Sequence, residues 1–290
     1  MQLGDRVPLF DRVGFSAPSA IIYDPAHDVY WVSNLNGEGP KGKGFISRLH
    51  PEGELTILNF IDAAQPGVVL DAPRGLAVSD DTLFVADVST IRKFKADSGE
   101  AQGTIDIPGA VYLSDLAVAV DGSLYATDVG SDPSVAALPD TGADAVYRIS
   151  PTGQVSTVAK RPDLGGPFAI LTNETGLWIA CTGTDDLLLL IPTESGEPAA
   201  DKGRLALPGG APRGLTGMPD GTFLISSAGA GAVYRGYRDG PFEPVITGLE
   251  SPADLGYDTR RKRVLIPLLT GHSLAIFALP PFEIKPPTPP

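Results

Sequence analysis

The chain has 290 residues, a formal net charge of −13 and a single cysteine. An acidic chain repels the phosphates of nucleic acids, so we expect no nucleic-acid partner. One cysteine excludes an intrachain disulfide, and no segment is long and apolar enough to span a membrane. The first residues lack the apolar core of a signal peptide. We expect the protein to be a monomer. Its localisation is expected to be cytoplasmic if the chain is complete, and periplasmic or secreted if a signal peptide has been removed.

Short strands rather than helices are indicated along the whole chain. Glycine and proline are abundant, at 34 and 28 residues, and the apolar residues come in short clumps between Gly, Pro, Asp and Ser. Such clumps bounded by turn residues are typical of short strands. No stretch of about 12 residues keeps a helical apolar stripe free of Gly and Pro.

Six similar units follow one another in the chain. Each begins with a short strand, followed by a turn with Asp or Gly, a second strand, a variable loop, a third strand and often a fourth. The residues just before the first apolar run, here called anchors, are Ala20, Gly75, Asp115, Ala169, Gly214 and Asp254, spaced by 55, 40, 54, 45 and 40 residues. Blades of propellers repeat at roughly 40–50 residues and have four strands. The sequence therefore predicts an all-β fold, a six-bladed β-propeller of four-stranded antiparallel blades.

The two ends of the chain predict how this ring closes. The sixth unit supplies three strands before Pro280, and residues 7–13 form an unassigned strand at the other end. We expect that N-terminal strand to pair near residues 274–279 and to complete the sixth blade, which removes open sheet edges. Residues 1–280 would then form a single propeller domain, and residues 281–290 a Pro-rich C-terminal tail.

A finer regularity relates the two halves of the ring. The second and fifth units both begin Ala-Pro-Arg-Gly-Leu, and the third and sixth both carry Asp-Leu at their anchors. Units three apart face each other across the axis of a six-membered ring. Arg74 should therefore oppose Arg213, and Asp115 should oppose Asp254.

Loops and strand ends can be assigned to the two faces of the ring. The start of each first strand and the end of each second strand lie on one face, called the top. That face collects Ser19, Ser114, Ala253, Cys181, Thr182 and Ser226 together with the site residues named below, and the long loops 35–44 and 129–143. Long loops are where binding usually resides. His27 and His50 fall in turns on the bottom.

The blade motif carries a resemblance to a known family. It reads apolar-Ala-Val-x-x-Asp-Gly-x-Leu-Tyr-x-x-Asp, as in residues 116–128, and over about 270 residues the chain resembles the SMP-30/gluconolactonase/LRE-like group and the related NHL-repeat propellers. The resemblance implies the propeller fold. It also implies, for catalytic members, a divalent metal held over the channel by Glu, Asn and Asp side chains.

At the positions that match those ligands, this chain has other residues. Ser19 stands near the Glu position, Phe168 at an Asn position, and Arg213 or Arg74 at an Asp position. Neither Arg nor Phe has an atom that can coordinate a metal ion. These departures predict that the metal site is lost and that no cofactor is needed. The alternative is a hydrolase of the gluconolactonase or arylesterase type, acting on lactones or esters with a Ca²⁺ or Zn²⁺ ion.

The predicted function is binding of a small-molecule or peptide-like ligand at the top mouth of the central channel, with no catalytic residue assigned. Two alternatives concern the arginines: each pairs with the Asp of the next blade, or both leave donors free for an anion. Asp115 and Asp254 could also cap their strands or ligate a metal, and Asp87 and Asp128 could bond to backbone. The candidate ligand-binding residues are Arg74, Arg213, Asp115, Asp254, Asn34, Asp87, Asp128, Phe168 and His272.

The remaining motifs favour structural roles. Residues 37–43 match the GxxxxGK phosphate loop but run into a strand instead of a helix, so a mobile Gly/Lys lid is expected there. Cys181, Trp31 and Trp178 lie in apolar strands and are expected in the core. No G-x-S-x-G nucleophile motif is present.

Overall fold

The computed structural model describes residues 6–7, 9–10, 13–37, 43–54, 56–131, 143–193 and 199–279. These residues form 23 strands and one 3₁₀ turn, η1 (Pro162–Leu164). Within the described part of the chain, no helix is long and apolar enough to cross a membrane.

The first three blades are four-stranded antiparallel sheets with strands in chain order. Blade one contains β1 (Pro18–Asp24), β2 (Val29–Asn34), β3 (Phe45–Leu49) and β4 (Ile57–Asp62). Blade two contains β5 (Pro73–Ser79), β6 (Thr82–Asp87), β7 (Thr90–Lys95) and β8 (Ala101–Asp106). Blade three contains β9 (Leu113–Val118), β10 (Leu124–Asp128), β11 (Ala145–Ile149) and β12 (Val155–Lys160).

The last three blades follow the same order, and the sixth has three strands of its own. Blade four contains β13 (Pro167–Asn173), β14 (Gly176–Cys181), β15 (Asp186–Ile191) and β16 (Ala200–Ala206). Blade five contains β17 (Pro212–Gly217), β18 (Thr222–Ser227), β19 (Ala232–Tyr237) and β20 (Glu243–Thr247). Blade six contains β21 (Gly256–Asp258), β22 (Arg263–Leu268) and β23 (Ser273–Ala278).

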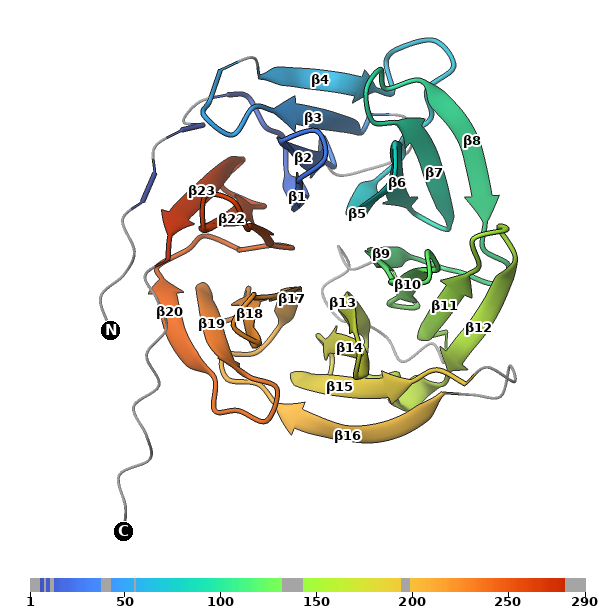
Figure 1. Cartoon of the computed structure of the whole chain (residues 1–290), viewed down its shortest axis with the longest axis vertical. Coiled ribbons are helices and arrows are strands. Elements are labelled where there is room, and N and C mark those ends of the chain that lie inside the picture. Colours follow the sequence, from blue (N-terminus) through green and yellow to red (C-terminus); the bar gives the residue numbers. More distant parts are fainter. Residues whose placement is uncertain are drawn as a thin grey trace.

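The blades surround a central axis, with the first strand of each blade innermost and the fourth outermost (Figure 1). Five of the six predicted anchors lie in these inner strands, and Asp254 lies just before β21, where it forms a parallel bridge with Ala20 of β1. The predicted six-bladed propeller is confirmed.

Apolar layers between neighbouring blades form the core. One cluster joins Trp31 of blade one to Leu83 of blade two, and another joins Trp178 of blade four to Phe223 of blade five. Inner and middle strands are buried, whereas the outer strands β8 and β16 are mostly exposed. Trp31, Trp178 and Cys181 are buried as predicted, with exposed fractions of 0%, 6% and 0%.

The N-terminal segment closes the ring where the sequence predicted it. Arg6 forms an antiparallel bridge with Phe277 of β23, and the backbone N–H of Val7 donates to the carbonyl of Ile276 at 2.8 Å. Phe10 and Phe15 pack into the apolar cluster between blades six and one. The predicted C-terminal tail, residues 281–290, lies outside the described residues.

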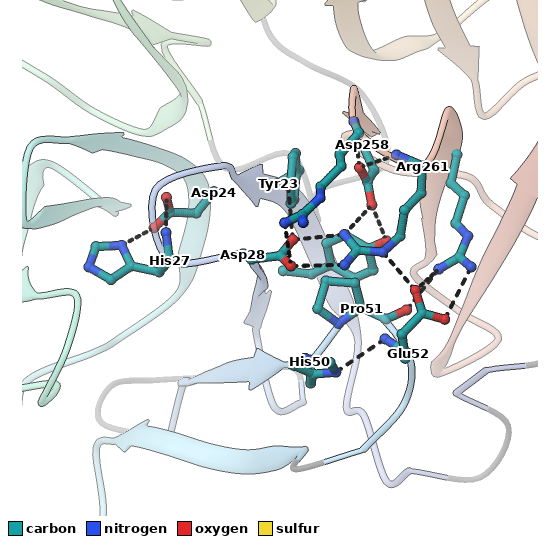
Figure 2. A network of polar contacts seen from close by, with 12 residues as sticks. Tyr23, Asp24, His27, Asp28, His50, Pro51, Glu52, Asp258 and Arg261 are labelled. Carbon is teal, nitrogen blue, oxygen red and sulfur yellow. Dashed lines mark hydrogen bonds and ion pairs between the residues drawn. The ribbon is translucent and has the colours of Figure 1, made fainter.

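A second contact joins blades six and one on the bottom of the ring, between turns that connect neighbouring strands of each blade (Figure 2). Both Asp28 oxygens accept from the guanidinium of Arg261, at 2.7 and 2.9 Å, and Arg261 also donates to Glu52 at 2.7 Å. Asp28 and Glu52 belong to turns of blade one, and Arg261 belongs to the β21–β22 turn. We call Asp28, Glu52 and Arg261 the bottom clasp. His27 and His50 lie in neighbouring bottom turns, as predicted.

Candidate functional site

Six residues at the starts of the inner strands surround the axis on the top face. Each is the residue immediately before an anchor, so the propeller places all six at the same level. We call this set the mouth ring: Ser19, Arg74, Ser114, Phe168, Arg213 and Ala253. Five of the six are buried, and Arg213 is half-buried.

Both arginines of the mouth ring cover aromatic rings of one apolar cluster. The guanidinium of Arg74 lies 4.8 Å from the ring centre of Tyr112, and that of Arg213 lies 4.5 Å from the ring centre of Phe168. Tyr112 and Phe168 pack with Val129 in a single cluster. A guanidinium stacked on a ring has a fixed orientation and keeps its in-plane N–H groups available for a planar anion.

Neither arginine is neutralised by the described residues. Arg74 and Arg213 form no ion pair and no hydrogen bond with them, and the Nε of each is buried without a partner. Burial and the nearby charge of Arg74 lower the pKa of Arg213 to about 10. Pairing of each arginine with the Asp of the next blade, one of the two predicted alternatives, is therefore not found among the described residues.

A hydroxyl of the mouth ring is also without a partner. Ser114 is only 3% exposed, and its Oγ is buried. Within the described part of the chain, this Oγ neither donates nor accepts a hydrogen bond. A buried polar group without a partner costs free energy, and such groups in a folded protein call for an explanation. Three of them, on Arg74, Ser114 and Arg213, lie at equivalent positions, each immediately before an anchor.

The two predicted aspartates contact each other instead of the arginines. Asp115 and Asp254 are 5% and 9% exposed, and their side chains are in hydrogen-bonding contact. Burial is the main cause that raises the pKa of both, that of Asp115 to about 7 and that of Asp254 well above its usual range. The pair therefore holds a proton at neutral pH, because two buried carboxylates in contact cannot both ionise cheaply.

Backbone N–H groups hold this pair in place. Asp115 accepts from its own neighbour Leu116 at 2.7 Å and from Ile170 of blade four at 2.8 Å. Asp254 accepts from the backbone of Leu215 in blade five and of Leu255 in its own blade. We call Asp115 and Asp254 the acid pair; through these bonds it joins blades three, four, five and six.

Three further predicted site residues cap backbone on the top face. Asp87 accepts from the backbone N–H of Asp71 and Ala72 at 2.8 and 2.7 Å, and Arg92 binds its other oxygen at 2.9 Å. Asp128 accepts from the N–H groups of residues 111, 112 and 130 at 2.8 to 2.9 Å.

Asn34 occupies the same place in blade one, where its side-chain oxygen accepts from Ser16 at 3.2 Å and its amide donates to Ser47 at 3.1 Å. All three residues end the second strand of a blade and hold the segment that leads into the first strand. Their polar atoms are occupied by the protein itself.

His272 lies on the top face at the seam between blades six and one. Its exposed side chain accepts a hydrogen bond from the backbone N–H of Ala17 at 2.9 Å through Nδ1. This bond requires a neutral ring with its proton on Nε2. The long top loops fall partly outside the described residues, at 38–42 and 132–142, and so does most of the GxxxxGK segment.

Two contributions to the site were missed at the level of sequence. Tyr112 lies three residues before its anchor, outside the repeating motif, and no periodic signal marks it. Ser114 was placed on the top face but was not selected as a site residue, because a lone serine carries no spacing pattern. Its position immediately before an anchor, equivalent to Arg74 and Arg213, was the available signal.

The fold places the chain among six-bladed β-propellers. It is similar to a gluconolactonase from Xanthomonas campestris, with 21% identity, a TM-score of 0.73, and coverage of 96% of this chain and 91% of that one. It is also similar to the calcium-binding protein regucalcin from Agrobacterium tumefaciens, with 17% identity, a TM-score of 0.68 and coverage of 96% and 94%.

A third solved structure with the same fold is virginiamycin B lyase from Staphylococcus aureus, with 14% identity, a TM-score of 0.63 and coverage of 95% of this chain and 98% of that one. No family model matches the chain, and no curated protein matches it by sequence. The resemblance predicted from the blade motif is confirmed by these structures at the level of the fold.

Proposed function

We propose that this propeller binds a small anionic ligand, carrying a carboxylate or a phosphate, at the mouth ring. The observation that carries the proposal is the set of three buried donors without partners, on Arg74, Arg213 and Ser114. A peptide-like ligand would satisfy the same donors with its C-terminal carboxylate.

Charge supports this choice of ligand. The charge of Arg74 is close enough to lower the pKa of Arg213, so the two guanidinium groups form a local region of positive charge in a chain of net charge −13. Positive charges that are poorly solvated and have no counter-charge raise the free energy of the folded protein. An anion that binds both arginines lowers this free energy. The planar fork of arginine suits the two oxygens of a carboxylate or phosphate.

The test is calorimetric titration of acetate, benzoate and inorganic phosphate into the wild type and the Arg74→Ala/Arg213→Ala double variant. We expect binding below millimolar concentration by the wild type and a loss of at least about tenfold in the double variant, since each charge-assisted bond contributes about 1.5–3 kcal/mol. Arg48→Ala is the matched control, because Arg48 also lies over aromatic rings, those of Trp31 and Phe60, but in blade one away from the mouth ring. If the wild type binds none of the three anions, the proposal is wrong.

A metal-dependent lactonase or esterase reaction does not fit these residues. The positions at which the resemblance implies metal ligands are occupied by Phe168 and by the positively charged Arg213, stacked on each other. A cation there would meet two guanidinium charges and an aromatic ring instead of oxygen ligands. We derive no step through a metal.

We therefore expect no resident divalent ion at the mouth ring. Elemental analysis of protein purified without added metal measures this directly. Stoichiometric Ca²⁺ or Zn²⁺ that survives dialysis and is lost in the Asp115→Asn variant would revive the hydrolase alternative.

A further inference from the structure

An apolar surface lies beside the donors of the mouth ring. Its buried part is the cluster of Tyr112, Val129 and Phe168 in blades three and four. Ala72 and Val88 of blade two pack against this cluster and are themselves only half-buried, so they extend its apolar surface to the solvent. We call Ala72 and Val88 the apolar rim.

The apolar residues and the donors come from the same segments of the chain. Ala72 lies two residues before Arg74, and Tyr112 lies two residues before Ser114. The guanidinium of Arg74 stacks on Tyr112 itself, so this donor group and the apolar cluster are in contact. An anion that binds these donors therefore lies next to apolar surface of blades two and three.

Val88 has an unfavourable backbone conformation. It is the first of the two residues in the turn between β6 and β7, because Asp87 pairs directly with Thr90. Its φ of 57° lies in the left-handed region, where a β-branched residue is an outlier. Two-residue hairpin turns that need a positive φ ordinarily have Gly, Asn or Asp at this position. Strain of this kind persists mainly where the strained residue serves a function.

The contacts of Val88 within the protein give little reason for a valine. Its backbone carbonyl accepts from the N–H of Leu113 at 2.6 Å, a bond that any residue type could make. Its side chain is half-buried, so it gains only part of the free energy that burial of a valine provides. What distinguishes valine from asparagine in this turn is the apolar surface that it presents beside the mouth ring.

The neighbouring carboxylates offer no partner to a polar ligand group. Asp87 and Asp128 immediately precede Val88 and Val129 in the chain. Asp87 accepts from two backbone N–H groups and from Arg92, and Asp128 accepts from three backbone N–H groups. Hydroxyl groups of a ligand would have to compete with these bonds, whereas an apolar group would not.

We infer that the anion bound at the mouth ring is that of an organic acid with an apolar body, aliphatic or aromatic, and that Val88 selects this body. The inference rests on the proposed function and adds the body of the ligand to its anionic group. Ligand sites are commonly apolar, with a few polar groups that fix the orientation of the ligand. Here Arg74, Arg213 and Ser114 hold the carboxylate, and the apolar rim contacts the body.

The first experiment compares hexanoate, gluconate and acetate by calorimetric titration into the full chain. Hexanoate and gluconate have the same number of carbon atoms and one carboxylate each, but gluconate carries hydroxyl groups along its chain. Burial of one methylene group strengthens binding by about fourfold, so we expect hexanoate to bind at least about tenfold more tightly than acetate. Gluconate should bind no more tightly than acetate.

The second experiment tests Val88 with the Val88→Asn variant. Asparagine tolerates a positive φ but lacks the apolar surface, so the variant should melt at or above the temperature of the wild type. Its affinity for hexanoate should fall by about threefold or more, while its affinity for acetate stays the same. Val120→Asn is the matched control, because Val120 is fully exposed in the turn between β9 and β10 on the bottom of the ring, and it should change neither affinity.

The outcomes separate the two proposals. Hexanoate that binds no more tightly than acetate overturns the apolar rim and leaves the anion site standing. Equal hexanoate affinity in Val88→Asn and the wild type, or equal losses of hexanoate and acetate affinity in that variant, overturns the role of Val88. A variant that melts below the wild type contradicts the argument from backbone strain. A wild type that binds neither carboxylates nor inorganic phosphate overturns both proposals.

Discussion

Gly75 and Gly214 are required by the close approach of neighbouring inner strands. Each follows an arginine of the mouth ring, and a methyl group on either one would lie within 3 Å of backbone atoms of the next blade. Backbone cannot give way as a flexible side chain can, so the strands would have to separate.

We predict that Gly75→Ala and Gly214→Ala each lower the free energy of unfolding by about 2–4 kcal/mol, since overpacking of a tight core typically costs 1–3 kcal/mol or more. Gly217→Ala is the control on the same strand, β17, because a Cβ there would meet only the side chain of Leu171 at 3.4 Å. That substitution should be neutral or slightly stabilising. Denaturant unfolding of the three variants measures the difference, and equal effects would contradict the packing argument.

The opposition of the arginines could be predicted from the repeat, but their orientation could not. The interval of 139 residues places Arg74 opposite Arg213. If the two halves were related by an exact two-fold axis, the two arginines would contact equivalent residues. Instead Arg74 stacks on Tyr112 of the following blade, whereas Arg213 stacks on Phe168 of the preceding blade. The two aromatic residues hold different places in their repeats, so no comparison of repeats reveals that both arginines converge on one cluster.

The acid pair was missed for a similar reason. One of the two alternatives drawn from the sequence pairs opposite charges, Arg74 with Asp115 and Arg213 with Asp254, and neither alternative brings the two aspartates into contact. The sequence does not show how deeply the two carboxyl groups are buried. It also does not show that they accept hydrogen bonds from backbone N–H groups of blades four and five. Burial, which sequence position alone does not fix, raises their pKa values and favours a shared proton over two ion pairs.

At the level of elements, the second strands of the first three blades end in residues that cap backbone. Asn34, Asp87 and Asp128 accept from the N–H groups that lead into the first strand of the same blade. The expectation that Asp87 and Asp128 bond to backbone is confirmed. Most of these N–H groups belong to the preceding top segment, which lies beside the end of the second strand; Asp128 also accepts from Gly130 in the turn that follows it.

We predict that Asp128→Ala lowers the free energy of unfolding by about 3–5 kcal/mol. The substitution removes the acceptor of three backbone N–H groups, and hydrogen bonds to a charged group contribute about 1.5–3 kcal/mol each without full additivity. Asp106→Ala, at the exposed end of β8, should change stability by less than about 0.5 kcal/mol. Thermal and denaturant unfolding compare them, and a tolerated Asp128→Ala would show that the cap is dispensable.

At the level of the whole molecule, a propeller depends on one seam where the ends of the chain meet. Besides the bond between Ala17 and His272 on the top face, contacts cross it on the inside, on the outside and on the bottom. Inside, Asp254 exchanges backbone hydrogen bonds with β1, at 3.0 Å to Ser19 and 3.2 Å from Ile21. Outside, Arg6 and Val7 extend β23, and the bottom clasp joins the turns. The N-terminal strand could be predicted because blade six lacked one, whereas the clasp could not, because its charges lie in turns far apart in sequence.

The bottom clasp allows a prediction with an internal control. Arg261 binds both oxygens of Asp28 and also Glu52, with 17% of its side chain exposed, whereas its neighbour Arg260 binds Asp28 with 67% exposed. We expect Arg261→Ala to cost about 1–2 kcal/mol of unfolding free energy, between the values typical of exposed and buried pairs, and Arg260→Ala to cost almost nothing. Equal melting temperatures of the two variants would contradict a structural role for the clasp.

Removal of residues 1–15 tests the outer contact of the seam. The deletion exposes the edge of β23 and uncovers Leu274 and Ile276, which Phe10 and Phe15 cover in the intact chain. An open strand edge beside an apolar surface favours association with other chains, so we expect a lower melting temperature and concentration-dependent aggregation, measured by light scattering. The inner bonds of Asp254 and the bottom clasp remain in the truncated chain, so at low concentration it should keep the circular dichroism of a folded β protein. Combining the deletion with Arg261→Ala removes both the outer and the bottom contacts of one seam, and the combined loss of stability should exceed the sum of the single losses. Unchanged melting and an unchanged monomer after the deletion would refute closure by the N-terminal strand, and strict additivity with Arg261→Ala would refute a seam shared by both contacts.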